Sequence, residues 1–220
     1  MNYTWNKLFS CRGVIVLFFV LTFSTACAVA VRQAFKVDQS LPIGNIQGDS
    51  FLGQRYPFKV KIPPGWQAST KYPDFLLQQG YDKEGLQATP VFLFNDRTKS
   101  SVQIDFSPAG RTVQFDQKLI EDLTRMGGGS FLSELREEHG KNIQVELSRV
   151  EPLQLKGVPY AARMSAKYAV KGESREQGWV YGFAEPFQIF ILYLLTGQDL
   201  NPDKEALEQI LPSFEYIGYQ

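Results

Sequence analysis

At 220 residues, the chain is long enough for an N-terminal targeting segment followed by one domain with a proper hydrophobic core. Basic and acidic residues balance at 23 each and 44% of residues are hydrophobic, which excludes a strongly basic nucleic-acid-binding protein and a largely disordered chain. The two cysteines, Cys11 and Cys27, both lie near the N-terminus. The domain that follows is therefore predicted to have no disulfide, no thiol nucleophile and no thiolate metal site.

Residues 1–31 have the pattern of an export signal or an N-terminal membrane anchor. Lys7 and Arg12 precede an uncharged, mostly apolar run from Val14 to Val31. Basic residues before such a run favour a cytoplasmic N-terminus. The run has about 18 residues, which is just enough for a helix that spans a bilayer.

The fate of this segment has three interpretations. Ser24-Thr-Ala-Cys27 resembles a bacterial lipobox, in which the cysteine is lipidated, although Ser24 stands where leucine is usual. Ala26-Cys-Ala28 and Ala28-Val-Ala30 fit ordinary cleavage sites with small residues. Lipidation of Cys27, a retained transmembrane helix and free secretion therefore all stay open. The first two anchor the domain to the cytoplasmic membrane on its extracytoplasmic side, in a periplasm or a lumen.

Residues 32–55 contain scattered glycine, proline and polar residues without a clear period, so we predict a linker there. A globular domain is predicted over 56–220. It opens with a strand in which Phe58, Val60 and Ile62 alternate with lysines, the period of a strand with one buried face. Pro63, Pro64 and Gly65 end that strand, and Trp66 follows, placed to fold back over the sheet edge.

The middle of the domain predicts short strands and then helices. Apolar or alternating stretches predict strands at 72–79, 89–94 and 101–106, joined as antiparallel hairpins. Asp105 should face away from its apolar neighbours, so we predict that it lies on the surface. A helix is predicted over 116–126 with Asp116 as its N-cap. Gly127-Gly-Gly129 should break that helix, with a second short helix over 131–139.

The C-terminal third predicts long strands and a last helix. Strands are predicted at 143–155, 160–170, 178–183 and 187–195. The stretch 187–195 is nearly all apolar, which suits a central strand with both faces covered by helices. Asn201 as N-cap and Pro202 at the first position predict a final helix, ended by Pro212. Residues 214–217 predict a short final strand or tail.

The opening Tyr56-Pro-Phe-Lys-Val-Lys-Ile-Pro-Pro-Gly-Trp66 resembles the entrance of PsbP-like and DcrB-like (Mog-type) domains. The middle helix, the hairpin around Leu155-Lys-Gly-Val-Pro159 and the closing helix with Ser213-Phe214 also fit this superfamily. The resemblance covers roughly 56–218 and implies an α+β fold, a mostly antiparallel β-sheet sandwiched by helices. Phe58, Pro63, Gly65, Trp66 and Phe214 carry this structural signature. Its members are mostly non-enzymatic, and they include lumenal photosystem II accessory proteins, bacterial lipoproteins and a Ran-binding cytosolic branch.

His139, the only histidine, follows Glu137-Glu138 at the end of a predicted helix. A metal or acid–base role needs partners that the sequence does not place, whereas a histidine that favours the helix dipole is common. A Ser-His-Asp triad would have to use His139, and the sequence has no Gly-x-Ser-x-Gly elbow. We predict no catalytic, cofactor or metal residues.

Three further patterns each have a functional and a structural interpretation. Gly127-Gly-Gly-Ser130 could present amides to an anion, but it lacks the lysine and spacing of a P-loop. Glu134, Glu137 and Glu138 with Arg136 could bind a cation, although a solvated helix face is commoner. Aromatic residues late in the chain could line a pocket or groove, although alternating aromatics in strands are usually core: Trp179, Tyr181, Phe183, Phe187, Phe190 and Tyr193.

These features predict a non-enzymatic, membrane-tethered, extracytoplasmic accessory domain. It should bind a membrane-protein or envelope partner and help to assemble or stabilise a complex, without nucleic acid and without a cofactor. One alternative is a small-ligand carrier that uses a cleft between sheet and helix. The other is a hydrolase with a carboxylate site.

Overall fold

The computed structural model describes residues 36–78, 91–110 and 113–218. The chain divides into two units, Met1–Ala34 and Phe35–Gln220, and the second contains all the described residues. Within the described ranges, no helix combines the length and the apolar character that crossing a bilayer requires. The predicted export or anchor segment over 1–31, with Cys27, lies outside the described residues and stays a prediction.

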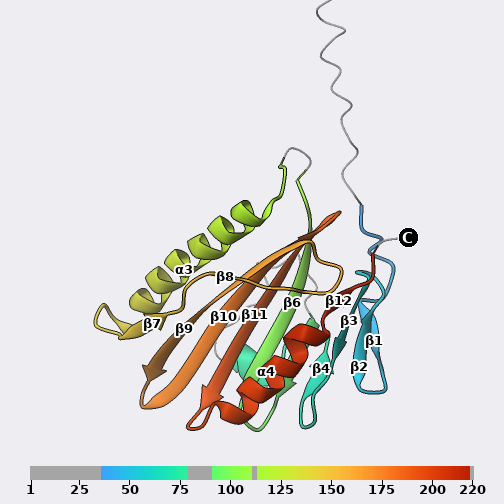
Figure 1. The fold of residues 1–220 in the computed structure, drawn as a ribbon. Helices are drawn as coiled ribbons and strands as arrows, with labels where there is room; N and C mark the ends of the chain where they lie inside the picture. The colour runs from blue at the N-terminus through green and yellow to red at the C-terminus, as the bar shows by residue number, and fades with distance from the viewer. Residues whose placement is uncertain (1–35, 79–90, 111–112, 219–220) are drawn as a thin grey trace, which may run out of the picture. The chain divides into compact units, whose positions relative to one another are not determined.

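A sheet of eight strands forms the centre of the domain (Figure 1). Its order is β4-β5-β6-β11-β10-β9-β7, with β8 also paired to β9, and every pair is antiparallel. The strands are β4 (Gln67–Ser69), β5 (Val91–Asn95), β6 (Ser100–Pro108), β7 (Val145–Leu147), β8 (Glu151–Pro152), β9 (Tyr160–Val170), β10 (Glu173–Ala184) and β11 (Phe187–Gly197). Together with the three helices found among the described residues, this arrangement confirms the predicted α+β fold class.

A second sheet has four strands in the order β1-β2-β3-β12. They are β1 (Gly44–Gln47), β2 (Ser50–Gly53), β3 (Phe58–Lys61) and β12 (Glu215–Tyr216). The hairpin of β1 and β2 corrects the predicted linker over 32–55, because it belongs to the folded domain. Phe51 buries its ring in the core, but two strands of four residues are too short to show a hydrophobic period in the sequence.

The helices cover opposite faces of the eight-stranded sheet. Alternate residues of a strand point to opposite faces. Trp179 packs on the side of α3 (Gln117–His139), whereas Val180 joins the core beneath α4 (Asn201–Ser213). A short helix, α2 (Asp74–Gln78), stands where a strand over 72–79 was predicted. Its Phe75 and Leu76 pack on Phe92, and so short an apolar run fits either structure.

The helix α3 runs unbroken through Gly127-Gly-Gly129, so the prediction of two helices is wrong. The glycines allow a close approach to the sheet. A Cβ on Gly128 would lie 3.1 Å from both Met164 Sδ and Trp179 Cζ2, and the indole Nε1 of Trp179 donates to the carbonyl of Thr124 at 2.7 Å. Burial against the sheet therefore outweighs the low helix propensity of glycine. The predicted N-cap is confirmed, since Asp116 Oδ1 accepts from the Leu119 amide at 2.7 Å.

The long C-terminal strands are found largely as predicted. β9 has the predicted bounds, β10 and β11 are longer than predicted, and the predicted strand over 143–155 is divided into β7 and β8. β11 is central, but Phe190 and Leu192 on its α3 side are only half-buried, so the predicted full cover holds on one face. At α4, Leu200 occupies the N-cap position and Asn201 is already helical.

Candidate functional site

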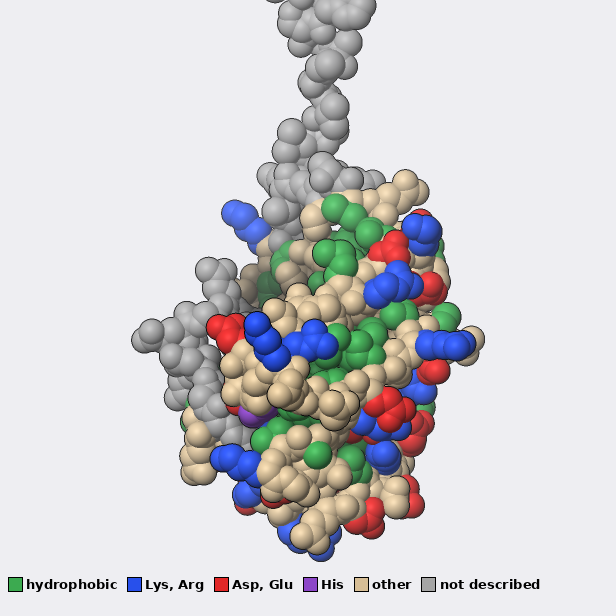
Figure 2. Space-filling model, turned by 90° about the vertical axis from the view of Figure 1, so that its left-hand side faces the viewer, with side chains coloured by type: hydrophobic (Ala, Val, Ile, Leu, Met, Phe, Trp, Pro, Cys, Tyr) green, Lys and Arg blue, Asp and Glu red, His purple; other side chains and the backbone are tan. Residues whose placement is uncertain are grey.

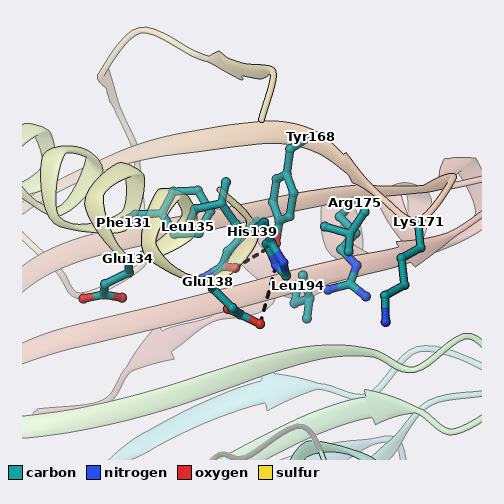
Figure 3. A pocket seen from close by; sticks show the side chains of 11 residues that line it. Phe131, Glu134, Leu135, Glu138, His139, Tyr168, Lys171, Arg175 and Leu194 are labelled. Atoms are coloured by element: carbon teal, nitrogen blue, oxygen red, sulfur yellow. Dashed lines mark hydrogen bonds and ion pairs between the residues drawn. The ribbon is translucent and has the colours of Figure 1, made fainter. Parts of the chain in front are cut away.

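An open hollow of about 630 Å³ lies between the C-terminal half of α3 and the turn that joins β9 to β10 (Figure 3). We call it the α3 groove. Side chains from α3, β9, β10 and β11 meet there. They are Phe131, Glu134, Leu135, Glu138, His139, Tyr168, Val170, Lys171, Arg175, Gln177 and Leu194.

Local structure explains why these side chains converge. Lys171 and Gly172 form the two-residue loop between β9 and β10, with φ of 52° and 85°. Positive φ at both positions is the geometry of the tight hairpin turns that match strand twist. In the register of this hairpin Arg175 lies opposite Tyr168. The last turns of α3 lie above this end of the hairpin and complete the groove (Figure 3).

The floor of the groove is apolar. The ring of Phe131 lies 5.7 Å from that of Tyr168 and 5.7 Å from that of Trp179, in tilted pairs. Leu135 and Leu194 are buried beside them. Tyr168 Oη also donates a hydrogen bond to Gln177 Oε1 at 3.3 Å.

The rims of the groove carry both signs of charge. Glu134 and Glu138 stand exposed on α3, and His139 Nε2 lies 3.5 Å from Glu138 Oε1 (Figure 3). Lys171 and Arg175 extend side by side from the opposite end. His139 is therefore a wall residue of the groove. Within the described ranges, no group of three histidine, cysteine or acidic side chains is placed to hold a metal ion.

Arg175 has an unusual environment in this groove. Its Nε is buried and has no hydrogen-bond partner among the described residues. Its ion pair, from Nη2 to Glu173 Oε2, is 3.8 Å long, which exceeds hydrogen-bond distance. The guanidinium therefore keeps donor capacity that the described part of the protein does not satisfy.

Asp105, on β6, lies on the same side of the sheet, and the prediction that it lies on the surface is wrong. It faces away from Ile104 and Phe106 as expected, yet it is largely buried, and burial raises the pKa of its carboxyl while a hydrogen bond from Gln103 opposes the shift. Its Oδ1 and the Tyr72 hydroxyl are buried without partners in the described ranges. Burial is the main cause that raises the pKa of the Tyr72 hydroxyl, and the negative charge of Asp105 adds to it. The alternating pattern predicted the correct face of β6, but it carried no information on the residues that bury that face.

A polar network fastens α4 to the sheet on the opposite face. Asp203 is 1% exposed and accepts hydrogen bonds from Asn95 Nδ2 at 3.2 Å and Ser100 Oγ at 2.6 Å. Ser100 Oγ in turn accepts from the Thr196 amide at 3.0 Å. Each buried polar group here has a partner, so we read this network as structural.

The residues of the structural signature lie on that opposite face. Phe58 and Phe214 are fully buried, with their rings stacked 5.7 Å apart. Pro63 and Trp66 are buried and Gly65 has a φ of 80°, and all three border a second hollow, of about 520 Å³, beside the start of α4. Cys27 lies outside the described residues. The five signature positions that the structure describes hold the fold, and none of them lines the α3 groove.

The late aromatic residues divide between the two faces. Trp179, Phe187 and Tyr193 are core residues. Tyr181, Phe183 and Phe190 are half-buried on the α3 side. The aromatic residues that line the α3 groove are instead Phe131 and Tyr168. The sequence did not single out Lys171, Arg175 or Tyr168 as site residues. Tyr168 belongs to the strand predicted over 160–170, and Lys171 and Arg175 lie between that strand and the next one, predicted over 178–183.

One face of the domain carries charges of both signs on its described residues. Figure 2 shows basic and acidic side chains interspersed over one face, with apolar patches between them. Such a surface differs from the continuous basic stripe of a nucleic-acid-binding face.

Comparisons with known proteins inform the fold. No family model and no curated protein matches the sequence. The solution structure of cyanobacterial PsbP (CyanoP) from Synechocystis sp. PCC 6803 is similar, with a TM-score of 0.51 and 14% identity, over 81% of this chain and 99% of that chain.

Two further solved structures are similar at lower scores. LpqN, involved in cell envelope biogenesis of Mycobacterium tuberculosis, has a TM-score of 0.45 and 13% identity, over 83% of this chain and 90% of that chain. The Saccharomyces cerevisiae Ran-binding protein Mog1p has a TM-score of 0.44 and 12% identity, over 73% and 90%. At these identities a likeness concerns the fold alone, and the similarity to CyanoP carries the conclusion: the described domain has a PsbP-like α+β fold.

Proposed function

We propose that this chain is a non-enzymatic accessory protein that binds a protein partner through the α3 groove. Its N-terminal segment would anchor it to the cytoplasmic membrane, with the domain on the extracytoplasmic side. The partner would be a membrane protein or an envelope component. The single observation that carries this proposal is the α3 groove itself, an open hollow with an apolar aromatic floor and charged rims.

The composition of the groove supports a protein ligand. Aromatic residues and arginine are enriched at the centres of protein interfaces, where they supply most of the binding energy. Phe131, Tyr168 and Arg175 meet this description at one site. The basic residues and apolar run near the N-terminus support the anchor, because that pattern directs export and fixes topology.

The test is co-purification of the full-length protein from gently solubilised membranes, with intact mass measured on the same sample. A groove variant would combine Lys171→Glu with Glu138→Lys, two exposed positions that line the groove. The matched control is Lys118→Glu at the far end of α3, where the side chain is 86% exposed. We expect a stoichiometric partner with wild type and control, and its loss with the groove variant. A partner retained by all three proteins would contradict the proposed site.

The small-ligand carrier is a second candidate, favoured by the size of the groove. A volume of about 630 Å³ lies within the range of ligand pockets, about 300–1,000 Å³. A carrier would purify with unexplained extra mass after any lipid on Cys27 is subtracted. Its melting temperature would rise with added ligand, by mass action. Turnover of a substrate that Asp105→Asn abolishes would instead support the hydrolase alternative.

A further inference from the structure

We propose that the Arg175 end of the α3 groove receives a carboxylate of the partner polypeptide, from a segment with an apolar side chain next to the acid and a basic residue beyond. This inference rests on the proposed function and specifies the chemistry of the ligand. It is carried by the unsatisfied guanidinium, by the apolar floor and by the order of charges along the groove.

The guanidinium supplies the first part of the argument. A buried donor without a partner costs free energy, and native proteins rarely keep one without a reason. Arg175 Nε is such a donor, and the nearby Glu173 is too distant to satisfy it, at 3.8 Å from Nη2. The Arg175 side chain is nevertheless 23% exposed, and the planar array of guanidinium N–H donors matches the two oxygens of a carboxylate.

The second cation at this end is Lys171. It stands exposed on the two-residue turn, beside Arg175 in Figure 3, and forms no ion pair among the described residues. Two adjacent cations raise the local potential and attract an anionic group. The chemistry of this end of the groove therefore favours a carboxylate.

The opposite end shows why the ligand should be a polypeptide. Glu134 stands there beside Phe131, and Glu138 lies between that end and the cations, next to Leu194 (Figure 3). An acyl chain with one anionic head would match the cations but leave two carboxylates beside its apolar tail. A peptide segment that carries an acidic, an apolar and a basic side chain in order complements the whole groove.

The experiment selects binders from a random heptapeptide display library on full-length protein in detergent micelles. We expect peptides with Asp or Glu at a fixed position beside an apolar residue. Changing that acid to its amide should weaken binding about tenfold or more, the usual value of a charged hydrogen bond. Arg175→Gln should cause the same loss, and the two changes combined should cost no more than either alone. Arg136→Gln, an exposed arginine on α3 that does not line the groove, should bind as wild type does.

Several outcomes would overturn the inference. These are enrichment of peptides without an acid, acidic peptides that bind Arg175→Gln as tightly as wild type, or no enrichment at all. Binding of dioleoylphosphatidylglycerol vesicles that depends on Arg175 and displaces the selected peptide would replace the polypeptide by an anionic lipid.

The same inference can fail while the proposed function stands. A co-purified partner that is lost with Lys171→Glu/Glu138→Lys but retained by Arg175→Gln would keep the groove as the binding site. It would contradict the proposed binding of a carboxylate at Arg175. A partner retained by both variants would contradict the α3 groove as the binding site.

Discussion

The two faces of the eight-stranded sheet are built differently. The face toward α4 carries one continuous core that includes residues of the small sheet, such as Phe58, and of α4, such as Ile210. The face toward α3 carries three separate clusters, under α2 and under the two halves of α3. Among the described residues, three of the four buried polar side-chain atoms without a hydrogen-bond partner, on Tyr72, Asp105 and Arg175, belong to this second face. The fourth, Glu176 Oε2, faces α4 and lies 3.1 Å from Lys204 Nζ.

This difference separates stability from binding. A continuous core excludes water and gains from every buried apolar group. A divided cover leaves a hollow with charged walls, which costs stability but leaves groups available to a ligand. Changes on the α4 face should therefore alter the free energy of unfolding most. Changes at the α3 groove should alter binding and leave unfolding nearly unchanged.

Phe58→Ala should give the largest loss of stability. The ring is fully buried and lies against Phe51, Phe106 and Phe214, with centroids 5.0 to 5.7 Å away. Removal of such a ring costs about 3–5 kcal/mol, which denaturant unfolding of the purified protein would measure. A loss below about 1 kcal/mol would contradict a continuous core on this face.

Gly178→Ala should be the next largest change. The ring of Tyr193 crosses Gly178 on β10, so an added Cβ would overlap it. Because the ring is buried, overpacking here should cost about 1–3 kcal/mol. Burial raises the pKa of Tyr193 to about 12. Displacement of the ring toward water in the variant should lower that pKa, as ultraviolet titration would show. An unchanged titration with unchanged stability would contradict the close approach.

The pair Gly128→Ala and Gly129→Ala tests how α3 lies on the sheet. Gly129 has open space around its Cα, so alanine there should stabilise the helix by up to about 1 kcal/mol. At Gly128 the new methyl meets Trp179, whose hydrogen bond to Thr124 holds it in place. Gly128→Ala should therefore be less stable than Gly129→Ala by about 1–2 kcal/mol. Equal gains from both would show that α3 does not press on Trp179.

Asp105→Asn tests the polar cover on the α3 face. Since burial raises the folded-state pKa, the carboxyl favours folding when protonated, below its ordinary pKa of about 3.9. That contribution is lost as pH rises through the raised folded-state pKa. The variant should then be more stable than wild type at pH 7, with the difference shrinking in acid. The pKa of Tyr72 should also fall, because Asp105 contributes to its shift. A variant less stable than wild type at pH 7 would contradict this.

Lys171→Glu should change stability least. The side chain is exposed and forms no ion pair among the described residues, so the free energy of unfolding should move by about 0.5 kcal/mol or less. Binding of an acidic peptide should nevertheless weaken, because the local charge is reversed. Equal binding by the variant would show that this end of the groove does not attract anions.

The sequence predicted the fold where strands were long and one-sided. Alternation over β9 gave its bounds, and the entrance ending in Trp66 gave the PsbP-like resemblance. Short elements were not predicted correctly, because β1, β2 and α2 have only four or five residues each and show no hydrophobic period. The continuity of α3 was not predicted for another reason. Its glycines allow close packing against Trp179, which lies 50 or more positions later in the chain.

The candidate site was less predictable than the fold. His139 and the glutamates of α3 were visible in the sequence, but not the cations that face them. Lys171 and Arg175 lie between two predicted strands, over 160–170 and 178–183, and only the packing of α3 over the β9–β10 hairpin brings them into one groove with Glu138. The unsatisfied state of Arg175 Nε depends on three-dimensional burial, for which a single sequence carries no signal.

The small sheet joins the beginning of the domain to its end. Tyr216 pairs with Phe58, and the amide of Lys61 donates to Ser213 Oγ at 2.9 Å, across 152 positions. A chain leaves a ribosome or an export channel N-terminus first. β3 therefore emerges long before β12, the strand with which it pairs. Contacts so distant in sequence form slowly and leave apolar strands open to aggregation. We therefore expect Phe58, whose ring stacks on Phe214, to complete its burial only when the C-terminal residues are in place.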